Sequence, residues 1–87
     1  MKSVGIYTSR SCPYCTNAKR LLQSKGVFFT EFIVDGDPKL AAEAVEKSGG
    51  RKTVPQIFIE NHHVGGYDDI VKLDKEGKLN SLMGLDK

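Results

Sequence analysis

The chain has 87 residues and a formal net charge of +2, with 39% hydrophobic and 28% charged residues. These proportions are ordinary for a globular protein and exclude a disordered or fibrous chain. Lysine and arginine are spread out, and no apolar run approaches the roughly 18 residues of a membrane-spanning helix. The N-terminal residues lack the long apolar stretch typical of a signal peptide. We therefore expect one domain over residues 1–87, in the cytoplasm, that binds neither nucleic acid nor membranes.

The first third of the chain alternates between strand-like and helix-like periods. Lys2–Thr8 predicts a strand, and the small polar residues of Ser9–Pro13 predict a turn. Apolar residues at helical spacing then predict a helix over Tyr14–Lys25, with the preceding proline suited to its first turn. Val27–Val34 is rich in β-branched and aromatic residues, so we expect a second strand there.

The middle of the chain predicts a helix and then a hairpin. Asp37 is the expected N-cap of the second helix, which ends at Ser48-Gly49-Gly50. Pro55–Glu60 is the expected third strand, joined by a turn at Asn61-His62 to a short fourth strand over His63–Gly65. The hairpin makes these last two strands antiparallel.

The C-terminal part predicts a third helix, capped by Asp68 and closed by Gly77, and a short helical turn over Leu79–Leu85. The order of elements is therefore βαβαββα. A βαβ unit implies parallel strands with a right-handed crossover, while the hairpin adds antiparallel ones. We expect an α/β protein with a thioredoxin-like fold, in which a mixed four-stranded sheet is flanked by helices.

The two cysteines, in Cys12-Pro13-Tyr14-Cys15, carry the expected chemistry. The predicted strand-to-helix junction places Cys12 at a helix start, where unpaired backbone N–H groups and the helix dipole favour a thiolate. Arg10 adds a positive charge nearby. Cys15 follows one turn later on the same helix face, so the two sulfurs can form and break a disulfide with little backbone movement.

A zinc site is the alternative interpretation of a C-x-x-C pair. A structural zinc site needs four ligands, and beyond the cysteines only His62 and His63 are available. Neighbouring histidines in a predicted turn are poorly spaced for one metal ion. We therefore expect redox chemistry and no metal site, and we assign the histidines no chemical role.

Three motifs together resemble the active-site set of dithiol glutaredoxins, in order and over essentially the whole chain. They are Cys12-Pro13-Tyr14-Cys15, Thr53-Val54-Pro55 and Gly65-Gly66-Tyr67-Asp68-Asp69. The chain is most similar to the short bacterial class of that family. The resemblance implies glutathione-dependent reduction of protein disulfides and glutathione mixed disulfides, with Cys12 as nucleophile and Cys15 as resolving thiol.

The resemblance also implies a glutathione groove and a cis peptide bond between Val54 and Pro55. The N–H groups of Tyr67 and Asp68 would hold the γ-glutamyl carboxylate, and the Asp68 side chain would meet the ammonium, although Asp68 could instead be only an N-cap. Tyr14 either packs over glutathione or shields the cysteines. The predicted glutathione-binding residues are Arg10, Tyr14, Lys52, Thr53, Val54, Pro55, Gly66, Tyr67 and Asp68.

The chain departs from the family pattern at two positions. Ser9 stands where many members have a lysine or arginine, so Arg10, Arg51 and Lys52 remain candidates for the cation that binds the glycyl carboxylate. Tyr67 replaces a cysteine that is often found there.

The resemblance implies a monomer with no tightly bound cofactor, which uses glutathione as co-substrate and acts on disulfide-bonded or glutathionylated proteins. Two other functions are compatible with the same residues. One is a module that binds a [2Fe–2S] cluster between two chains, which Pro13 disfavours. The other is a thioredoxin-like electron donor reduced by a flavoprotein, which Asp68 and its loop disfavour.

Overall fold

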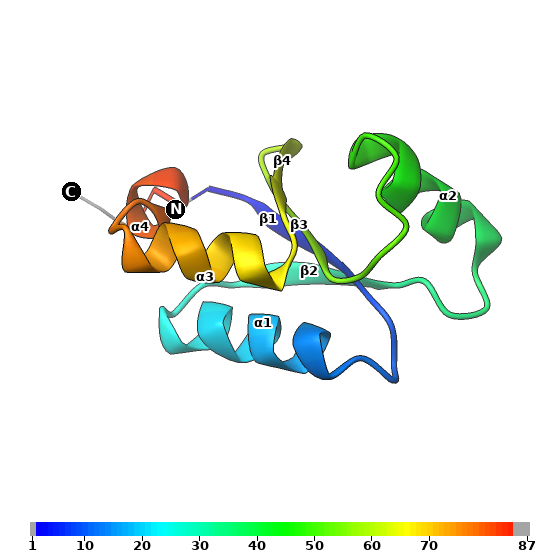
Figure 1. Ribbon diagram of the computed structural model, residues 1–87, viewed down its shortest axis with the longest axis horizontal. Coiled ribbons are helices and arrows are strands. Elements are labelled where there is room, and N and C mark those ends of the chain that lie inside the picture. The colour runs from blue at the N-terminus through cyan, green and yellow to red at the C-terminus, as the bar shows by residue number, and fades with distance from the viewer. Residues whose placement is uncertain (1, 85–87) are drawn as a thin grey trace.

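A computed structural model describes residues 2–84 and contains one mixed β-sheet with helices on both of its faces (Figure 1). In chain order the elements are β1 (Val4–Thr8), α1 (Pro13–Ser24), β2 (Phe29–Ile33), α2 (Pro38–Lys47), β3 (Gln56–Ile59), β4 (His62–Gly65), α3 (Tyr67–Lys75) and α4 (Leu79–Leu82). The strand order is β2-β1-β3-β4; β1 and β2 are parallel, and the other neighbouring pairs are antiparallel. The predicted fold class is confirmed.

The central strands are buried on both faces because their side chains alternate between two separate cores. On β3, Ile57 and Ile59 face the core beneath α1, α3 and α4, whereas Phe58 faces α2. The first core is formed by Val4, Ile6, Ala18, Leu22, Val27, Ile57, Ile59, Ile70, Leu79 and Met83. The second, smaller core is formed by Tyr7, Ala44 and Phe58.

Helix α1 is held against the sheet by its apolar face. Ala18 and Leu22, four residues apart, are fully buried, and complete burial of a leucine contributes about 1.5–3 kcal/mol. Pro13 occupies the first helical position, where the missing N–H costs nothing, and Gly26 follows the helix with a φ of 71°. These contacts set the direction of the helix axis, and with it the position of Cys12 at its N-terminal end.

The predicted first two strands were too long at their N-terminal ends. The Lys2 N–H donates to the Met83 carbonyl oxygen (3.0 Å), and the Val27 N–H donates to the Leu22 carbonyl oxygen (3.0 Å). Both N–H groups therefore bond to helix ends and not to neighbouring strands. At the other end of the chain α4 is confirmed, while Leu85 lies outside the described residues.

The predicted turn of the hairpin was displaced by one residue. The two turn residues are Glu60 and Asn61, whose φ angles are 52° and 67°, as a two-residue turn between antiparallel strands requires. His62 and His63 consequently both belong to β4. The hairpin also contains a register shift: Ile57 pairs with Gly65, but Phe58 pairs with His63.

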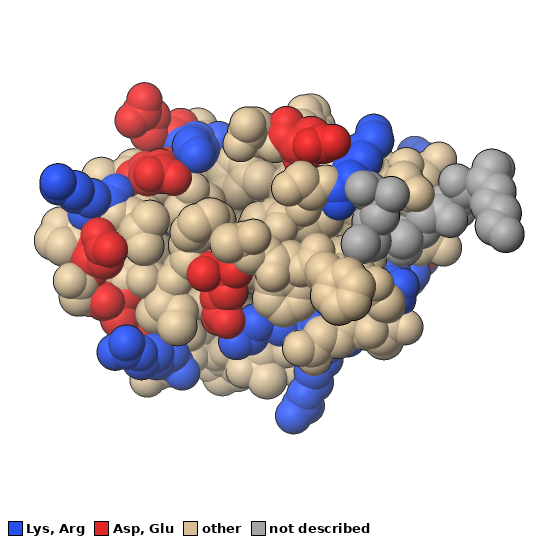
Figure 2. All heavy atoms as spheres, turned by 180° about the vertical axis from the view of Figure 1, so that it is seen from behind, with Lys and Arg blue, Asp and Glu red and all other residues tan. Residues whose placement is uncertain are grey.

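Charged side chains of both signs are distributed over the surface. On the face shown in Figure 2, basic and acidic side chains are interspersed, and neither sign gathers into a single patch. Among residues 2–84, no helix has the length and apolar character needed to cross a membrane.

Candidate active site

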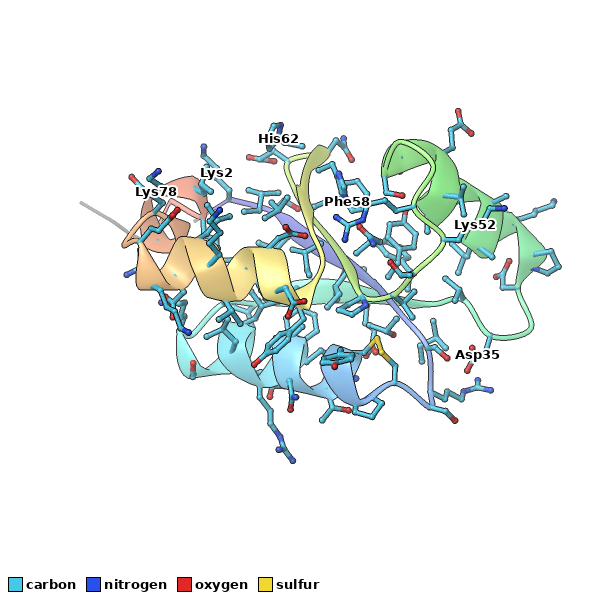
Figure 3. The ribbon with its side chains drawn as sticks, in the orientation of Figure 1. Lys2, Asp35, Lys52, Phe58, His62 and Lys78 are labelled. Atoms are coloured by element: carbon cyan, nitrogen blue, oxygen red, sulfur yellow. A yellow bond between two sulfur atoms is a disulfide. The ribbon has the colours of Figure 1, made fainter. Side chains whose placement is uncertain are left out.

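The cysteine pair lies at the N-terminal end of α1, where the yellow sulfur–sulfur bond marks it in Figure 3. Cys12 is the N-cap residue, with extended backbone (φ −130°, ψ 101°), and its Sγ accepts the Cys15 N–H at 3.0 Å. The two residues form a disulfide, with Cα atoms 5.2 Å apart. Cys15 is only 1% exposed and Cys12 is half-buried, so Cys12 is the cysteine that an external sulfur can reach.

The segment before β3 passes beside the Cys12 sulfur. The Cys12 Sγ lies 3.7 Å from the carbonyl oxygen of Val54. The peptide bond between Val54 and Pro55 is cis, as the family resemblance implied. Thr53 is exposed and Pro55 is buried, so this segment presents its backbone next to the sulfur while its proline anchors it to the protein interior.

Two glycines, Gly65 and Gly66, allow the start of α3 to pack closely against the same segment. Gly65 has a φ of 133°, which favours glycine, and a side chain there would overlap Asp69. A Cβ on Gly66 would lie 3.2 Å from the Pro55 carbonyl oxygen, which is closer than ordinary contact. The absence of side chains at both positions therefore lets α3 begin directly beside Pro55.

The side chain that accepts the N–H of the N-cap residue of α3 belongs to Asp69 and not to Asp68, so the predicted capping role of Asp68 is wrong. The N-cap is Gly66, whose N–H donates to Asp69 Oδ2 (2.8 Å). Arg51 Nη1 donates to the same oxygen (3.1 Å). The Gly66 N–H, and then Arg51, lower the pKa of Asp69 against the opposing effect of partial burial. Asp68 is thereby left exposed in the first turn, with its carboxylate available to a ligand.

These elements enclose a pocket of about 290 Å³, lined by Tyr14, Arg51, Thr53, Val54, Pro55, Gly66, Tyr67, Asp68 and Asp69. Seven of the nine residues predicted to bind glutathione therefore meet at one place. Arg10 and Lys52 do not line it, whereas Arg51 and Asp69 do. The capping role of Asp69 was missed, although the three-residue spacing from Gly66 was a signal that could have identified it.

Two tyrosines, Tyr14 and Tyr67, line this pocket. The rings of Tyr14 and Tyr67 have centroids 6.1 Å apart with an angle of 32° between their planes. Tyr14 is 61% exposed and so remains largely open to contact with a bound molecule.

The turn that leads into Cys12 is tied to the segment after β2 by Asp35, which sequence reasoning also missed. Asp35 accepts from the Arg10 backbone N–H (2.9 Å) and from Ser9 Oγ (2.8 Å). These bonds, the backbone N–H first, lower the pKa of Asp35. The Arg10 side chain is exposed, and its residue is held through the backbone.

We find no group of three or more His, Cys, Asp or Glu side chains within residues 2–84 that is arranged to hold a metal ion.

Comparison with known proteins gives consistent matches over nearly the whole chain. The family profile described as Glutaredoxin matches residues 4–64. Glutaredoxin 3 of Escherichia coli is 51% identical over 83 residues, which cover 95% of this chain and 99% of that protein. The solution structure of a glutaredoxin from Brucella melitensis has a TM-score of 0.85 and 52% identity, covering 100% of this chain and 94% of that one. A buckwheat glutaredoxin–glutathione complex has a TM-score of 0.85 at 24% identity, covering 95% and 77%.

Proposed function

This chain belongs to the glutaredoxin family, whose members are thiol–disulfide oxidoreductases, and from that premise we propose that Cys12 is its nucleophile and Cys15 its resolving thiol. The observation that carries the assignment is the position of the Cys12 sulfur. It caps α1, receives a backbone N–H and is the more exposed of the two sulfurs. Backbone N–H groups at a helix start stabilise a thiolate, which is the species that attacks a disulfide.

On a glutathione mixed disulfide, the Cys12 thiolate attacks the sulfur of the glutathionyl group. The new bond joins Cys12 to glutathione, and the substrate sulfur leaves as a thiolate that takes a proton from solvent. A second glutathione thiolate then attacks the glutathionyl sulfur, which releases glutathione disulfide and restores the Cys12 thiolate. On a protein disulfide, Cys15 instead displaces the substrate from Cys12 and closes the intramolecular disulfide, which two glutathione molecules reduce.

The pocket beside Cys12 is the proposed glutathione site. The first N–H groups of α3, at Tyr67 and Asp68, provide donors for one carboxylate, and the exposed Asp68 carboxylate can meet the ammonium. The Val54 backbone next to the sulfur suits an extended peptide. The buckwheat relative, which shares the fold, is a glutathione complex, and this supports the assignment.

The glycyl carboxylate needs a cation, and Arg51 is the proposed partner. Arg51 lines the pocket, whereas Arg10 and Lys52 do not. Its guanidinium already contacts Asp69 and is exposed enough to contact a ligand as well. The serine at position 9, which donates to Asp35, leaves this role to Arg51.

A coupled assay tests the proposed function directly. The reduced protein is mixed with glutathione, glutathione reductase, NADPH and a small glutathione mixed disulfide, and NADPH oxidation is followed. We expect turnover that depends on both the protein and glutathione. Turnover that requires thioredoxin reductase, with none from glutathione, would contradict the proposal and favour a thioredoxin-like donor.

We also propose that the protein acts as a monomer in a reducing, cytoplasmic compartment, on glutathionylated and disulfide-bonded proteins. A Cys15→Ser variant, which cannot resolve mixed disulfides through Cys15, should trap such partners on Cys12. Mass spectrometry of the trapped species, with the location of each partner, is the measurement. Partners drawn mainly from secreted proteins would contradict the compartment.

We propose that this protein is a catalyst with no tightly bound cofactor, and not a protein that holds a [2Fe–2S] cluster between two chains. Cluster binding would require Cys12 of two chains, with glutathione thiolates completing the four-sulfur shell. Pro13 stiffens the backbone next to Cys12 and removes an N–H that could bond a cluster sulfur, and Cys15 competes for the same sulfur. Anaerobic purification with glutathione, followed by visible absorption and size-exclusion chromatography, should give a colourless monomer. A brown dimer would contradict the proposal.

A further inference from the structure

Gln56, the first residue of β3, is a buried polar side chain whose hydrogen-bonding partners come from two different segments. It is 0% exposed. Its Nε2 donates to the Thr53 carbonyl oxygen (3.0 Å) and to Thr53 Oγ1 (3.3 Å), and its Oε1 lies 2.7 Å from Nε2 of His63. A buried amide left without these partners would be costly, so the three contacts hold it in one place.

The partners also determine which way the amide points. The Thr53 carbonyl oxygen can only accept, so the NH₂ end of Gln56 faces Thr53 and its oxygen faces His63. The His63 Nε2 must therefore carry a hydrogen and donate it. Burial, and then the positive charge of Arg51, lower the pKa of His63 and favour its neutral form, in which only one ring nitrogen carries a hydrogen.

The position of His63 follows from the register of the hairpin. His63 is opposite Phe58, and its ring lies 5.1 Å from the Phe58 ring, between centroids. Gln56 is two residues before Phe58 on the same strand and so is the diagonal neighbour of His63 on one face of the sheet. The register shift of the hairpin lies between Ile57 and Phe58, and Phe58 then pairs with His63. This pairing places the His63 imidazole beside the Gln56 amide.

The chain of contacts ends at the reacting sulfur. Thr53 and Val54 both line the pocket, and the Val54 carbonyl oxygen lies 3.7 Å from Cys12 Sγ. We propose that Gln56 and His63 are positioning residues, which hold Thr53 and thereby the Val54 backbone in place for the peptide backbone of glutathione. The inference rests on the proposed function, because it assigns these residues to recognition of glutathione and not to the reactivity of Cys12.

Two small disulfide substrates distinguish recognition of glutathione from the intrinsic reactivity of Cys12. In a Cys15→Ser background, reduced Cys12 attacks one sulfur of glutathione disulfide, which forms the Cys12–glutathione disulfide and releases one glutathione. Bis(2-hydroxyethyl) disulfide reacts at the same sulfur but has no peptide to pair with Val54. Second-order rates with both compounds, measured by acid quenching and mass spectrometry, are compared for each variant.

We expect His63→Ala to lower the rate with glutathione disulfide by about two- to tenfold, the effect of one hydrogen bond. The rate with bis(2-hydroxyethyl) disulfide should not change. Gln56→Glu has nearly the same shape but offers Thr53 no N–H donor, so it should have the same selective effect. His63→Gln keeps an N–H close to the position of Nε2 and should restore most of the lost rate.

His62→Ala is the matched control. His62 is the neighbouring residue of β4, is exposed and projects away from the sheet in Figure 3. This variant should react like the parent with both disulfides. An equal loss with both compounds in the His63 and Gln56 variants, or no loss with either, would overturn the inference. A parent that reacts no faster with glutathione disulfide than with bis(2-hydroxyethyl) disulfide would overturn the proposed function as well.

Discussion

Two helices begin at the same pocket, and their N-terminal ends are occupied by different groups. At α1 the cap is the sulfur of Cys12, and the first turn contains no acidic residue. At α3 the cap is Gly66, and the first turn contains both Asp68 and Asp69. The Cys15 N–H meets a sulfur in the first case, and the Gly66 N–H meets a carboxylate in the second.

This difference shows how one physical property serves two purposes. Every helix start has unpaired N–H groups and a partial positive charge. At α1 no acidic side chain neutralises this charge, so it can stabilise the Cys12 thiolate that forms when the disulfide is reduced. At α3, Asp69 neutralises part of the charge and fixes the backbone, while the N–H groups of the first turn remain for a ligand. The α1 start is therefore proposed to react, and the α3 start to bind.

Replacing each cysteine should have the largest effects. We expect Cys12→Ser to abolish activity, because the remaining thiol, that of Cys15, is buried and out of reach of a substrate disulfide. Cys15→Ser should keep reduction of a glutathionylated peptide but lose dithiol reduction of protein disulfides. Both variants are assayed on a glutathionylated peptide and on an insulin-type disulfide. Equal loss in the two variants on the peptide would contradict the assigned roles.

The second prediction concerns the charge left unneutralised at α1. We expect the N–H groups at the start of α1 to lower the pKa of the reduced Cys12 thiol below that of a free cysteine, about 8.5. The rate of alkylation by iodoacetamide is measured against pH in the Cys15→Ser background. An inflection at the value of free cysteine would show that the start of α1 does not stabilise the thiolate.

The third prediction separates Asp68 and Asp69, the two acidic residues in the first turn of α3, by their effect on ligand binding. Asp68→Ala should raise the KM for glutathione by about tenfold, the lower part of the range for charged hydrogen bonds, because Asp68 is exposed. The pH dependence of Cys12 alkylation should stay as in the parent. Steady-state kinetics with varied glutathione measure the effect. An unchanged KM would mean that the ammonium binds elsewhere.

The fourth prediction separates the same residues by stability. Asp69→Ala removes the bond to the Gly66 N–H and should lower the free energy of unfolding by about 0.5–2 kcal/mol at pH 7. Because the folded-state pKa of Asp69 is lowered, its contribution is present above about pH 4 and is lost as the pH falls through that lowered value.

Urea unfolding of Asp69→Ala and of the parent at pH 7 and at low pH measures this loss. The two proteins should converge at low pH. Asp68→Ala is the control, and its unfolding free energy should change by only about a few tenths of a kcal/mol. A similar loss in both variants at pH 7 would show that Asp69 has no special capping role.

Most of the fold could be predicted from the sequence, because its helices and strands follow local patterns. Asp37 accepts the Leu40 N–H (3.1 Å) and caps α2 ahead of Pro38, as a local capping rule anticipates. The hairpin turn was misplaced by one residue, because Glu60 is not a residue that favours a positive φ. Which two residues form the turn was decided by the pairing of β3 and β4.

The sequence by itself determined the helical segments, the order of helices and strands along the chain, and the three-residue spacing that brings the two cysteine sulfurs together. These depend on residues close in the chain, whose spacing is the same in any helix or strand. Only the tertiary structure decided that Arg51 and not Arg10 or Lys52 lines the pocket, and that His63 contacts Gln56. Such contacts depend on strand register and on how α3 meets the segment before β3, which arise from packing between residues far apart in the chain.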